Sequence, residues 1–282
     1  MTCTIMKYLG CIFLLTFSFS CKKVVFTNSD NPPIDSVNSN TAYVSSMRIF
    51  QPHKQKIDSF SFDASKRLTK FNQYVFDTSN GQPVKDSMLA VFVYSSKETT
   101  PNSYVLYFSD KTSQTHLLSY DNKGRIIKDT SGDTHFVTYY SYPANKIAFT
   151  IYFEGEISDS QDDTLSFTNG NVTSERIYFT DGTDKELSGD LHTQYSSLKS
   201  PTYYSSIVNS FGQLLNILST ESFVEFMGWR NYESKNLFNI LSGTASDEYQ
   251  TITFDWTTDN KGNVVKGVGR NNSKYSYQFY YY

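Results

Sequence analysis

The chain has 282 residues, of which 19% are charged and 16% aromatic, and its formal net charge at pH 7 is −3. This mildly acidic balance lacks the basic footprint of a nucleic-acid-binding protein, and the sequence shows no polybasic patch that would hold it on anionic lipid. All three cysteines lie within the first 21 residues. The rest of the chain therefore has no disulfide, no thiolate nucleophile and no cysteine-based metal site.

The first 20 residues have the layout of a bacterial lipoprotein signal peptide. A single lysine precedes the apolar run of residues 9–17, which is too short for a comfortable permanent membrane helix. A small residue directly before Cys21 is similar to a lipobox, although Phe19 departs from its strict form. Residues 1–20 are therefore predicted to be removed and Cys21 to be acylated, which would anchor the chain stably. Cleavage near Ser20 without acylation is the alternative.

Residues 21–44 are predicted to be a flexible tether, since they are polar, rich in turn-forming residues and unable to form a core. Residues 45–282 are predicted to be a single β-rich domain, because short β-branched and aromatic runs alternate there with turn clusters. The clearest runs are residues 88–94, 104–108, 147–153, 176–179, 251–254 and 275–279. The expected fold class is mainly β, an antiparallel β-meander, and an open sheet, a partial barrel and a closed barrel all fit this pattern.

One stretch interrupts the β pattern. Ser200 is a suitable helix N-cap and Pro201 a suitable first helical residue. Apolar residues then recur at steps of three and four, which predicts one or two helices within residues 201–229. We expect these helices to cap an edge or an end of the sheet.

The string of residues 120–126 is the most informative short motif. Tyr120 closes one strand, the side chain of Asp121 is suited to accept backbone N–H bonds, Gly124 supplies a positive φ, and Arg125 re-enters the partner strand. We therefore predict a turn-structural role for these four residues. Related strings occur at residues 62–68 and 254–264, without the fixed period of a solenoid.

These hairpins resemble the tyrosine–aspartate repeats of large bacterial surface proteins. Residues 45–282 as a whole resemble a family of Bacteroidetes lipoproteins of unknown function with a porin-like β fold. The resemblance is carried by short motifs, namely Cys21, the hairpin of residues 120–126, the predicted helix after Ser200, residues 234–236, the turn of residues 259–264 and the last aromatic strand. It implies a β fold and an envelope location, and it transfers no catalytic residue.

Candidate metal and calcium sites are weak. The four histidines (His53, His116, His135 and His192) show no ligand spacing beyond Asp133 near His135, so we interpret them as ordinary strand or surface residues. Residues 159–163 and 181–184 have the oxygen ligands of a calcium loop but lack its glycine and its later glutamate. We therefore predict no metal and no cofactor.

Two further sets of residues are candidates for function. Glu154 and Glu156 are expected on one side of a strand and would serve a glycan-active hydrolase, but a pair of carboxylates is common. Trp256 and Trp229 are candidates for ligand binding, because an aromatic ring can stack on a sugar or grip a partner protein.

The predicted function is that of a non-enzymatic cell-envelope lipoprotein, anchored in the outer membrane through Cys21 on its periplasmic or cell-surface side. It would bind a glycan or an envelope protein, or serve structurally, and it would not bind nucleic acid. The first alternative is a secreted glycan-active hydrolase. The second is an integral outer-membrane β-barrel, which the aromatic residues that end the chain favour and the shortness of several predicted strands disfavours.

Overall fold

The computed structural model describes residues 43–78, 83–95, 98, 100–132, 136–153, 156–201, 236–245 and 248–282, all of which belong to one compact unit. These residues form 16 strands and no helix. The strands are β1 (Val44–Phe50), β2 (Lys54–Phe62), β3 (Leu68–Asp77), β4 (Val84–Val93), β5 (Ser103–Phe108), β6 (Ser113–Tyr120), β7 (Ile126–Ser131), β8 (Val137–Ser141), β9 (Lys146–Phe153), β10 (Glu156–Thr168), β11 (Asn171–Asp181), β12 (Asp184–Lys199), β13 (Asn236–Ala245), β14 (Glu248–Thr258), β15 (Val264–Gly269) and β16 (Ser276–Tyr281).

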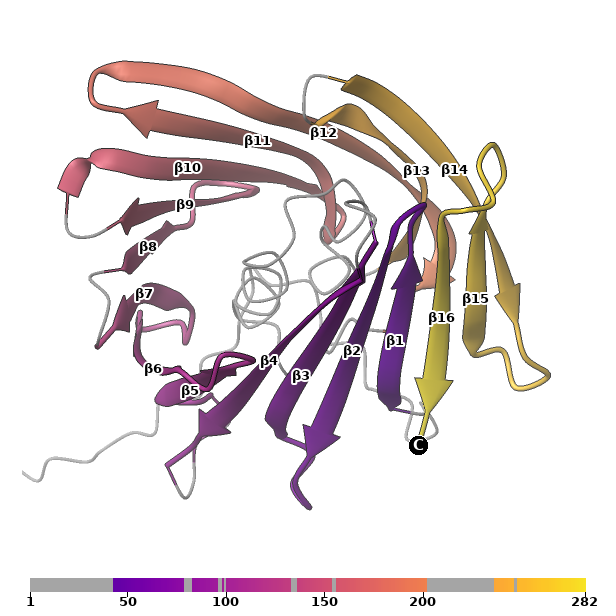
Figure 1. Ribbon diagram of the computed structural model, residues 1–282, viewed down its shortest axis with the longest axis horizontal. Coiled ribbons are helices and arrows are strands. Elements are labelled where there is room, and N and C mark those ends of the chain that lie inside the picture. The colour runs from indigo at the N-terminus through magenta and orange to yellow at the C-terminus, as the bar shows by residue number, and fades with distance from the viewer. Residues whose placement is uncertain are drawn as a thin grey trace, which may run out of the picture. The chain divides into compact units, whose positions relative to one another are not determined.

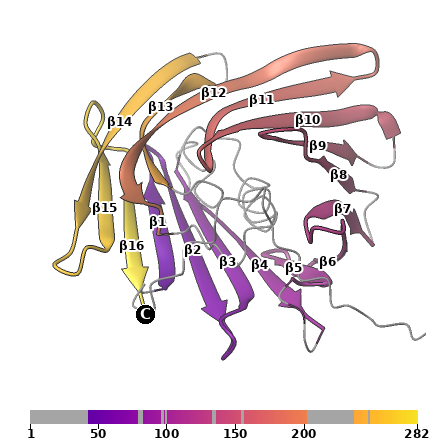
Figure 2. The same ribbon diagram turned by 180° about the vertical axis from the view of Figure 1, so that it is seen from behind.

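Each strand pairs antiparallel with the next strand along the chain, and β1 pairs with β16, so that the sheet closes into a barrel (Figures 1 and 2). The predicted fold class, mainly β and antiparallel, is confirmed, and the closed barrel is the form that the meander takes. The helices expected within residues 201–229 lie outside the described residues, apart from Pro201.

The seam of the barrel joins the two ends of the described chain. The β1–β16 register runs from Val44 opposite Tyr281 to Phe50 opposite Ser276. Beyond the last pair, the N–H of Tyr282 donates to the carbonyl of Tyr43 over 3.0 Å. Closure removes the unpaired strand edges that an open sheet would expose to other chains.

The antiparallel topology places alternate turns at opposite ends of the barrel. One end, which we call the chain-end rim, contains the start of β1, the end of β16 and the turns that follow even-numbered strands. The other end, the opposite rim, contains the turns that follow odd-numbered strands. The described turn residues of the chain-end rim are 63–67, 94–95, 98, 100–102, 121–125, 142–145, 169–170, 200–201 and 259–263; those of the opposite rim are 51–53, 78, 83, 109–112, 132, 136, 182–183 and 270–275.

Candidate functional site

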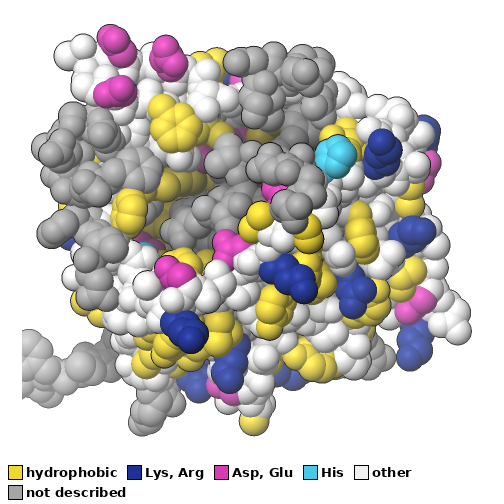
Figure 3. Space-filling view, viewed as in Figure 1, with side chains coloured by type: hydrophobic (Ala, Val, Ile, Leu, Met, Phe, Trp, Pro, Cys, Tyr) yellow, Lys and Arg dark blue, Asp and Glu magenta, His cyan; other side chains and the backbone are white. Residues whose placement is uncertain are grey.

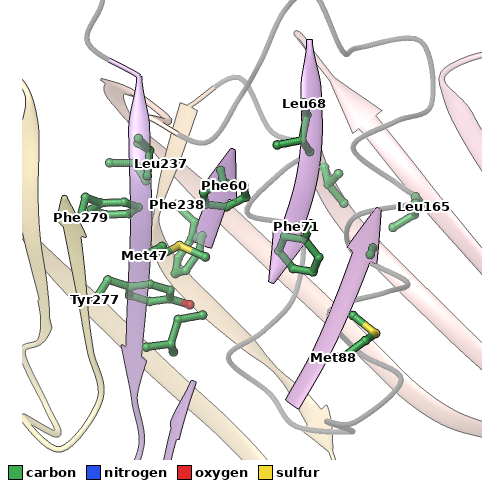
Figure 4. Packing of buried hydrophobic residues seen from close by; sticks show 14 of the residues in the cluster. Met47, Phe60, Leu68, Phe71, Met88, Leu165, Leu237, Phe238, Tyr277 and Phe279 are labelled. Carbon is green, nitrogen blue, oxygen red and sulfur yellow. The ribbon is translucent and has the colours of Figure 1, made fainter. Parts of the chain in front are cut away.

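The inner wall of the barrel is largely apolar. Buried side chains alternate with more exposed ones along each strand, as a two-residue period requires, and the buried rows form one hydrophobic cluster. Figure 4 shows part of this cluster, with Met47 of β1 close to Tyr277 and Phe279 of β16. Aromatic rings of β13, β14 and β16 pack edge to face or stacked, with centroids 5.3–6.4 Å apart, and they are Phe238, Phe254, Trp256, Tyr277 and Phe279.

The outer wall is mainly polar. Figure 3 shows basic and acidic side chains among hydrophobic ones on the face that it views. The outward positions of β1–β3 and β10–β16 are mostly Ser, Thr, amide or charged residues, such as Arg48, Asn72, Arg176 and Asp255. In the described residues these rows do not form the continuous apolar band of about 25 Å that a membrane-spanning barrel presents to lipid.

An apolar strip interrupts this polar wall on β4–β6. Val93 and Leu117 are 48% and 59% exposed there, and Tyr107 is 47% exposed. Val91 and Val105 lie opposite each other in the same strip. Single exposed apolar side chains are ordinary on protein surfaces, but a contiguous group is less common. No helix among the described residues is long and apolar enough to cross a membrane.

A buried polar cluster lies in the inner wall where β5, β6 and β7 run side by side. The rings of Tyr104 and His116 stack with centroids 4.5 Å apart, at an interplanar angle of 16°. His116 Nδ1 lies 2.9 Å from Asp129 Oδ1, and the Tyr104 hydroxyl donates to Asp129 Oδ2 over 2.5 Å. All three residues are buried, with relative exposures of 1% for Tyr104, 6% for His116 and 5% for Asp129.

The hydrogen bonds of this cluster set the protonation pattern of the histidine. The Asp129 carboxylate only accepts, so that Nδ1 of His116 must carry the hydrogen of their shared bond. In the neutral ring Nε2 is then a lone-pair acceptor. Nε2 is buried and has no hydrogen-bond partner among the residues that the structure describes. A buried polar atom without a partner is uncommon in folded proteins and calls for an explanation.

A second polar group lies in the buried wall on β2 and β3. Lys56 and Asp58 are 3% and 0% exposed, and Lys56 Nζ lies 3.4 Å from Asp58 Oδ2. The amide of Gln73 donates to the other oxygen of Asp58 over 3.1 Å. Removing Asp58 would leave the Lys56 ammonium group buried without this counter-ion, which is costly. These two groups are among several polar sites of the buried wall, which also contains the carboxylates of Asp163 and Glu175.

The predicted turn residues occupy one tight hairpin between β6 and β7. Asp121 Oδ1 accepts the N–H groups of Lys123 and Arg125, each over 2.9 Å, and Asp121 Oδ2 accepts from the Arg125 guanidinium. Gly124 has a φ of 74°, which only glycine adopts without strain. The hydroxyl of Tyr120, whose ring is half-buried, donates to the carbonyl of Pro101 over 2.5 Å. The related turns repeat this pattern around Asp63 and Asp259.

A tyrosine from a neighbouring strand braces each of these hairpins, a feature that the sequence analysis missed. The hydroxyls of Tyr94, Tyr142 and Tyr281 donate to the backbone carbonyls of Leu68, Ile126 and Val264, each the first or second residue after its turn, over 2.5–2.8 Å. Burial raises the pKa of Tyr94 and of Tyr281. Tyrosines at or just after the ends of β4, β8 and β16 are the sequence signal of this arrangement.

The remaining candidates from the sequence are placed as follows. Trp256 lies on β14 facing inward, and its indole N–H donates to the carbonyl of Phe238 over 2.8 Å. Ligand binding by Trp256 stays a prediction. The other candidates lie outside the described residues. They are Cys21, Trp229, His135, Glu154 and the side chain of Glu156.

The two calcium-like stretches are parts of a strand and of a hairpin turn. Asp162 and Asp163 lie within β10 and point to opposite faces, because Asp162 contacts Lys185 whereas Asp163 is buried. Residues 182–183 form the turn between β11 and β12. Among the described residues no three His, Cys, Asp or Glu side chains are grouped as metal ligands would be. Of the three described histidines, His53 and His192 lie in separate exposed positions and His116 is buried.

Comparison with solved structures finds chains similar to this one. No family model and no curated protein matches the sequence. A solved structure described as a porin-like protein from Bacteroides uniformis is 15% identical and matches 86% of this chain and 98% of its own, with a TM-score of 0.49. We draw no conclusion about function from this likeness. Membership of the lipoprotein family that the sequence resembles stays a prediction.

Proposed function

We propose that this protein is a non-enzymatic binding protein of the bacterial envelope, which holds an amphipathic molecule inside its barrel. The apolar part of the molecule would lie against the inner wall, and its hydroxyl group would donate to Nε2 of His116. The observation that carries the proposal is this buried acceptor without a partner, on a wall that is otherwise mostly apolar.

The dimensions expected of the barrel support a ligand in its interior. Sixteen strands spaced about 4.8 Å apart and tilted by about 40° enclose a barrel of about 30 Å between opposite backbones. Two opposing layers of side chains do not span that width, whereas an eight-stranded barrel is filled by its own side chains. The mostly apolar character of the inner wall favours an apolar occupant over a free sugar.

The polar cluster supports a hydroxyl group as the part of the ligand that is recognised. Asp129 fixes the hydrogen on Nδ1 of His116, so the neutral ring presents an acceptor and no donor at Nε2. Stacking on Tyr104 holds the plane of the imidazole. A site built to accept a hydrogen bond discriminates against an analogue that lacks the donor, because its buried acceptor then stays unpaired.

The envelope location rests on the sequence of the leader. Acylation of Cys21 would anchor the protein in the outer membrane and keep its binding site close to a lipid source. Mass spectrometry of the mature N-terminus tests this part separately. An acylated Cys21 supports the anchor, and an unmodified N-terminus near residue 20 contradicts it.

The binding proposal is tested with two matched probes on the purified full chain. Dodecanol has a hydroxyl donor and its methyl ether has none, and calorimetry measures the affinity of each. We expect dodecanol to bind about threefold to tenfold more tightly, the equivalent of one hydrogen bond. In His116→Asn, whose amide nitrogen can replace Nδ1 but not Nε2, the affinities should become equal while that of the ether stays unchanged.

The matched control is His192→Asn, since His192 is exposed on the outer wall. This variant should keep the wild-type preference for dodecanol. Equal affinities of the two probes in the wild type would overturn the role of His116. The absence of binding by both probes would overturn the interior binding site itself.

A further inference from the structure

The chain-end rim gathers lysines that are far apart in the sequence. Five lysines lie in its turns or at the strand ends that border it, and all five are exposed. In the described part of the chain none of their ammonium groups forms an ion pair with a carboxylate. They are Lys66, Lys123, Lys146, Lys199 and Lys261.

Three of the four described acids in the turns of this rim are directed into their turns, and the fourth, Glu98, is exposed. The carboxylates of Asp63 and Asp121 accept hydrogen bonds from backbone N–H groups and from the arginine four residues later. Asp259 bonds in the same way to the backbone and side chain of Asn263. These partners neutralise or occupy the carboxylates, whereas the neighbouring lysines extend into solvent. The charge that the described residues of this rim present to solvent is therefore more positive than a count of their acidic and basic residues indicates.

The opposite rim has no such excess among its described residues. In the β11–β12 hairpin Lys185 is surrounded by Asp181, Asp184 and Glu186. Arg270 at the same end is paired with Asp255, at 2.5 Å between Nη2 and Oδ1. Among the described residues, the barrel therefore has a basic end and an end where charges balance.

The basic end is also the end at which the predicted tether enters the barrel. The described chain begins there with Tyr43, and the ammonium group of Lys66 lies 5.3 Å from the centre of its ring. About 20 residues separate Tyr43 from Cys21, so an anchor at Cys21 would keep this rim within about 25 Å of the membrane on average.

We infer that the chain-end rim is a docking surface for the anionic phospholipid headgroups of the membrane. Its lysines are complementary in charge to lipid phosphates, and the tether would present this end to them. Each lysine close to an anionic surface raises the partition coefficient about fivefold, and the attraction decays within a Debye length of about 10 Å. The inference does not require acylation, because the five lysines act without the anchor.

Cosedimentation of the full chain with lipid vesicles tests the inference. The chain carries Cys21→Ser, so that no acyl group contributes to binding. Vesicles of equal parts phosphatidylglycerol and phosphatidylcholine are compared with vesicles of phosphatidylcholine alone. We expect binding to the anionic vesicles only, weakening as salt is added. The triple variant Lys66→Glu, Lys123→Glu and Lys261→Glu should lower the partition coefficient at least about tenfold.

The matched control reverses three lysines of the opposite rim, Lys85→Glu, Lys111→Glu and Lys274→Glu. Lys66 and Lys111 both have positive φ, 63° and 73°, so each triple variant contains one strained position. This control variant should bind the anionic vesicles as tightly as the chain that carries Cys21→Ser alone. An equal loss in both triple variants, no binding to anionic vesicles, or binding to a soluble acidic polysaccharide in preference to vesicles would each overturn the inference.

Discussion

The Trp256 ring on β14 packs against Gly267 of β15, which has no side chain to block it. Gly267 lies opposite both Trp256 and Tyr277, and a β-carbon at this position would overlap the six-membered ring of Trp256. The indole covers the glycine and reaches the Tyr277 ring, at 5.7 Å between centroids. A large ring on one strand thus fills the space that the glycine on the next strand leaves open.

Gly267→Ala is therefore expected to lower the free energy of unfolding by about 1–3 kcal/mol, because the indole is held by its hydrogen bond to Phe238 and cannot move aside freely. Urea denaturation followed by tryptophan fluorescence measures the change. Gly132→Ala is the control, since the nearest atom to its β-carbon would be the Thr115 carbonyl oxygen at 3.5 Å. An equal effect of the two substitutions would contradict the packing argument.

At the scale of the element, the β6–β7 hairpin links charge to local structure. Burial acts to raise the pKa of Asp121. Hydrogen bonds from the Arg125 backbone, the Arg125 guanidinium and the Lys123 backbone lower this pKa by more than burial raises it, so it lies below its usual value. A carboxyl group with a lowered folded-state pKa stabilises the fold above its unfolded pKa of about 3.9. That contribution is lost as the pH falls through the folded-state pKa.

Asp121→Asn should accordingly destabilise the protein at neutral pH, by about 1 kcal/mol because the site is partly exposed. The difference from the wild type should shrink as the pH is lowered from about 5 to about 2, because the wild type then loses the same contribution. Urea midpoints measured across that range provide the test. Asp184→Asn, at an exposed carboxylate of the opposite rim, should change the midpoint little at neutral pH. A constant difference at all pH values would contradict the pKa argument.

The strands were predictable from the sequence because their signal is local. The runs at residues 88–94, 147–153 and 251–254 fall within or next to β4, β9 and β14. The string that starts at Tyr120 contains the residues that form its turn.

The closure and the polar cluster were not predictable, because both depend on contacts distant in sequence. The β1–β16 pair joins residues more than 200 positions apart, and His116 meets Asp129 only through the register of the β6–β7 hairpin, at a separation of 13 residues. His116 was therefore interpreted as an ordinary strand residue. The five lysines of the chain-end rim are also far apart in the sequence and come to one end of the molecule only in the folded barrel. The sequence alone therefore showed no basic patch.

At the scale of the whole molecule, the seam determines whether the sheet has edges. Deletion of residues 276–282 removes β16. The edges of β1 and β15 that paired with β16 are then exposed. Exposed edges pair with other chains. We therefore expect the truncated protein to elute as soluble aggregates in size-exclusion chromatography, whereas Tyr280→Ser, which alters an outward side chain of the same strand, elutes as the wild type does. A monomeric truncated protein would show that the seam is dispensable.

The position of the seam also sets an order of events in time. A chain that leaves the cytoplasm with its amino end first delivers β1 long before β16. Until β16 has arrived, β1 has only one of its two neighbouring strands. The growing meander then has an edge strand with unpaired backbone groups at each side. Contacts of such long sequence separation form slowly. Closure of the barrel therefore waits for β16, and in the proposed envelope location the interval before closure is when the protein most needs protection by chaperones.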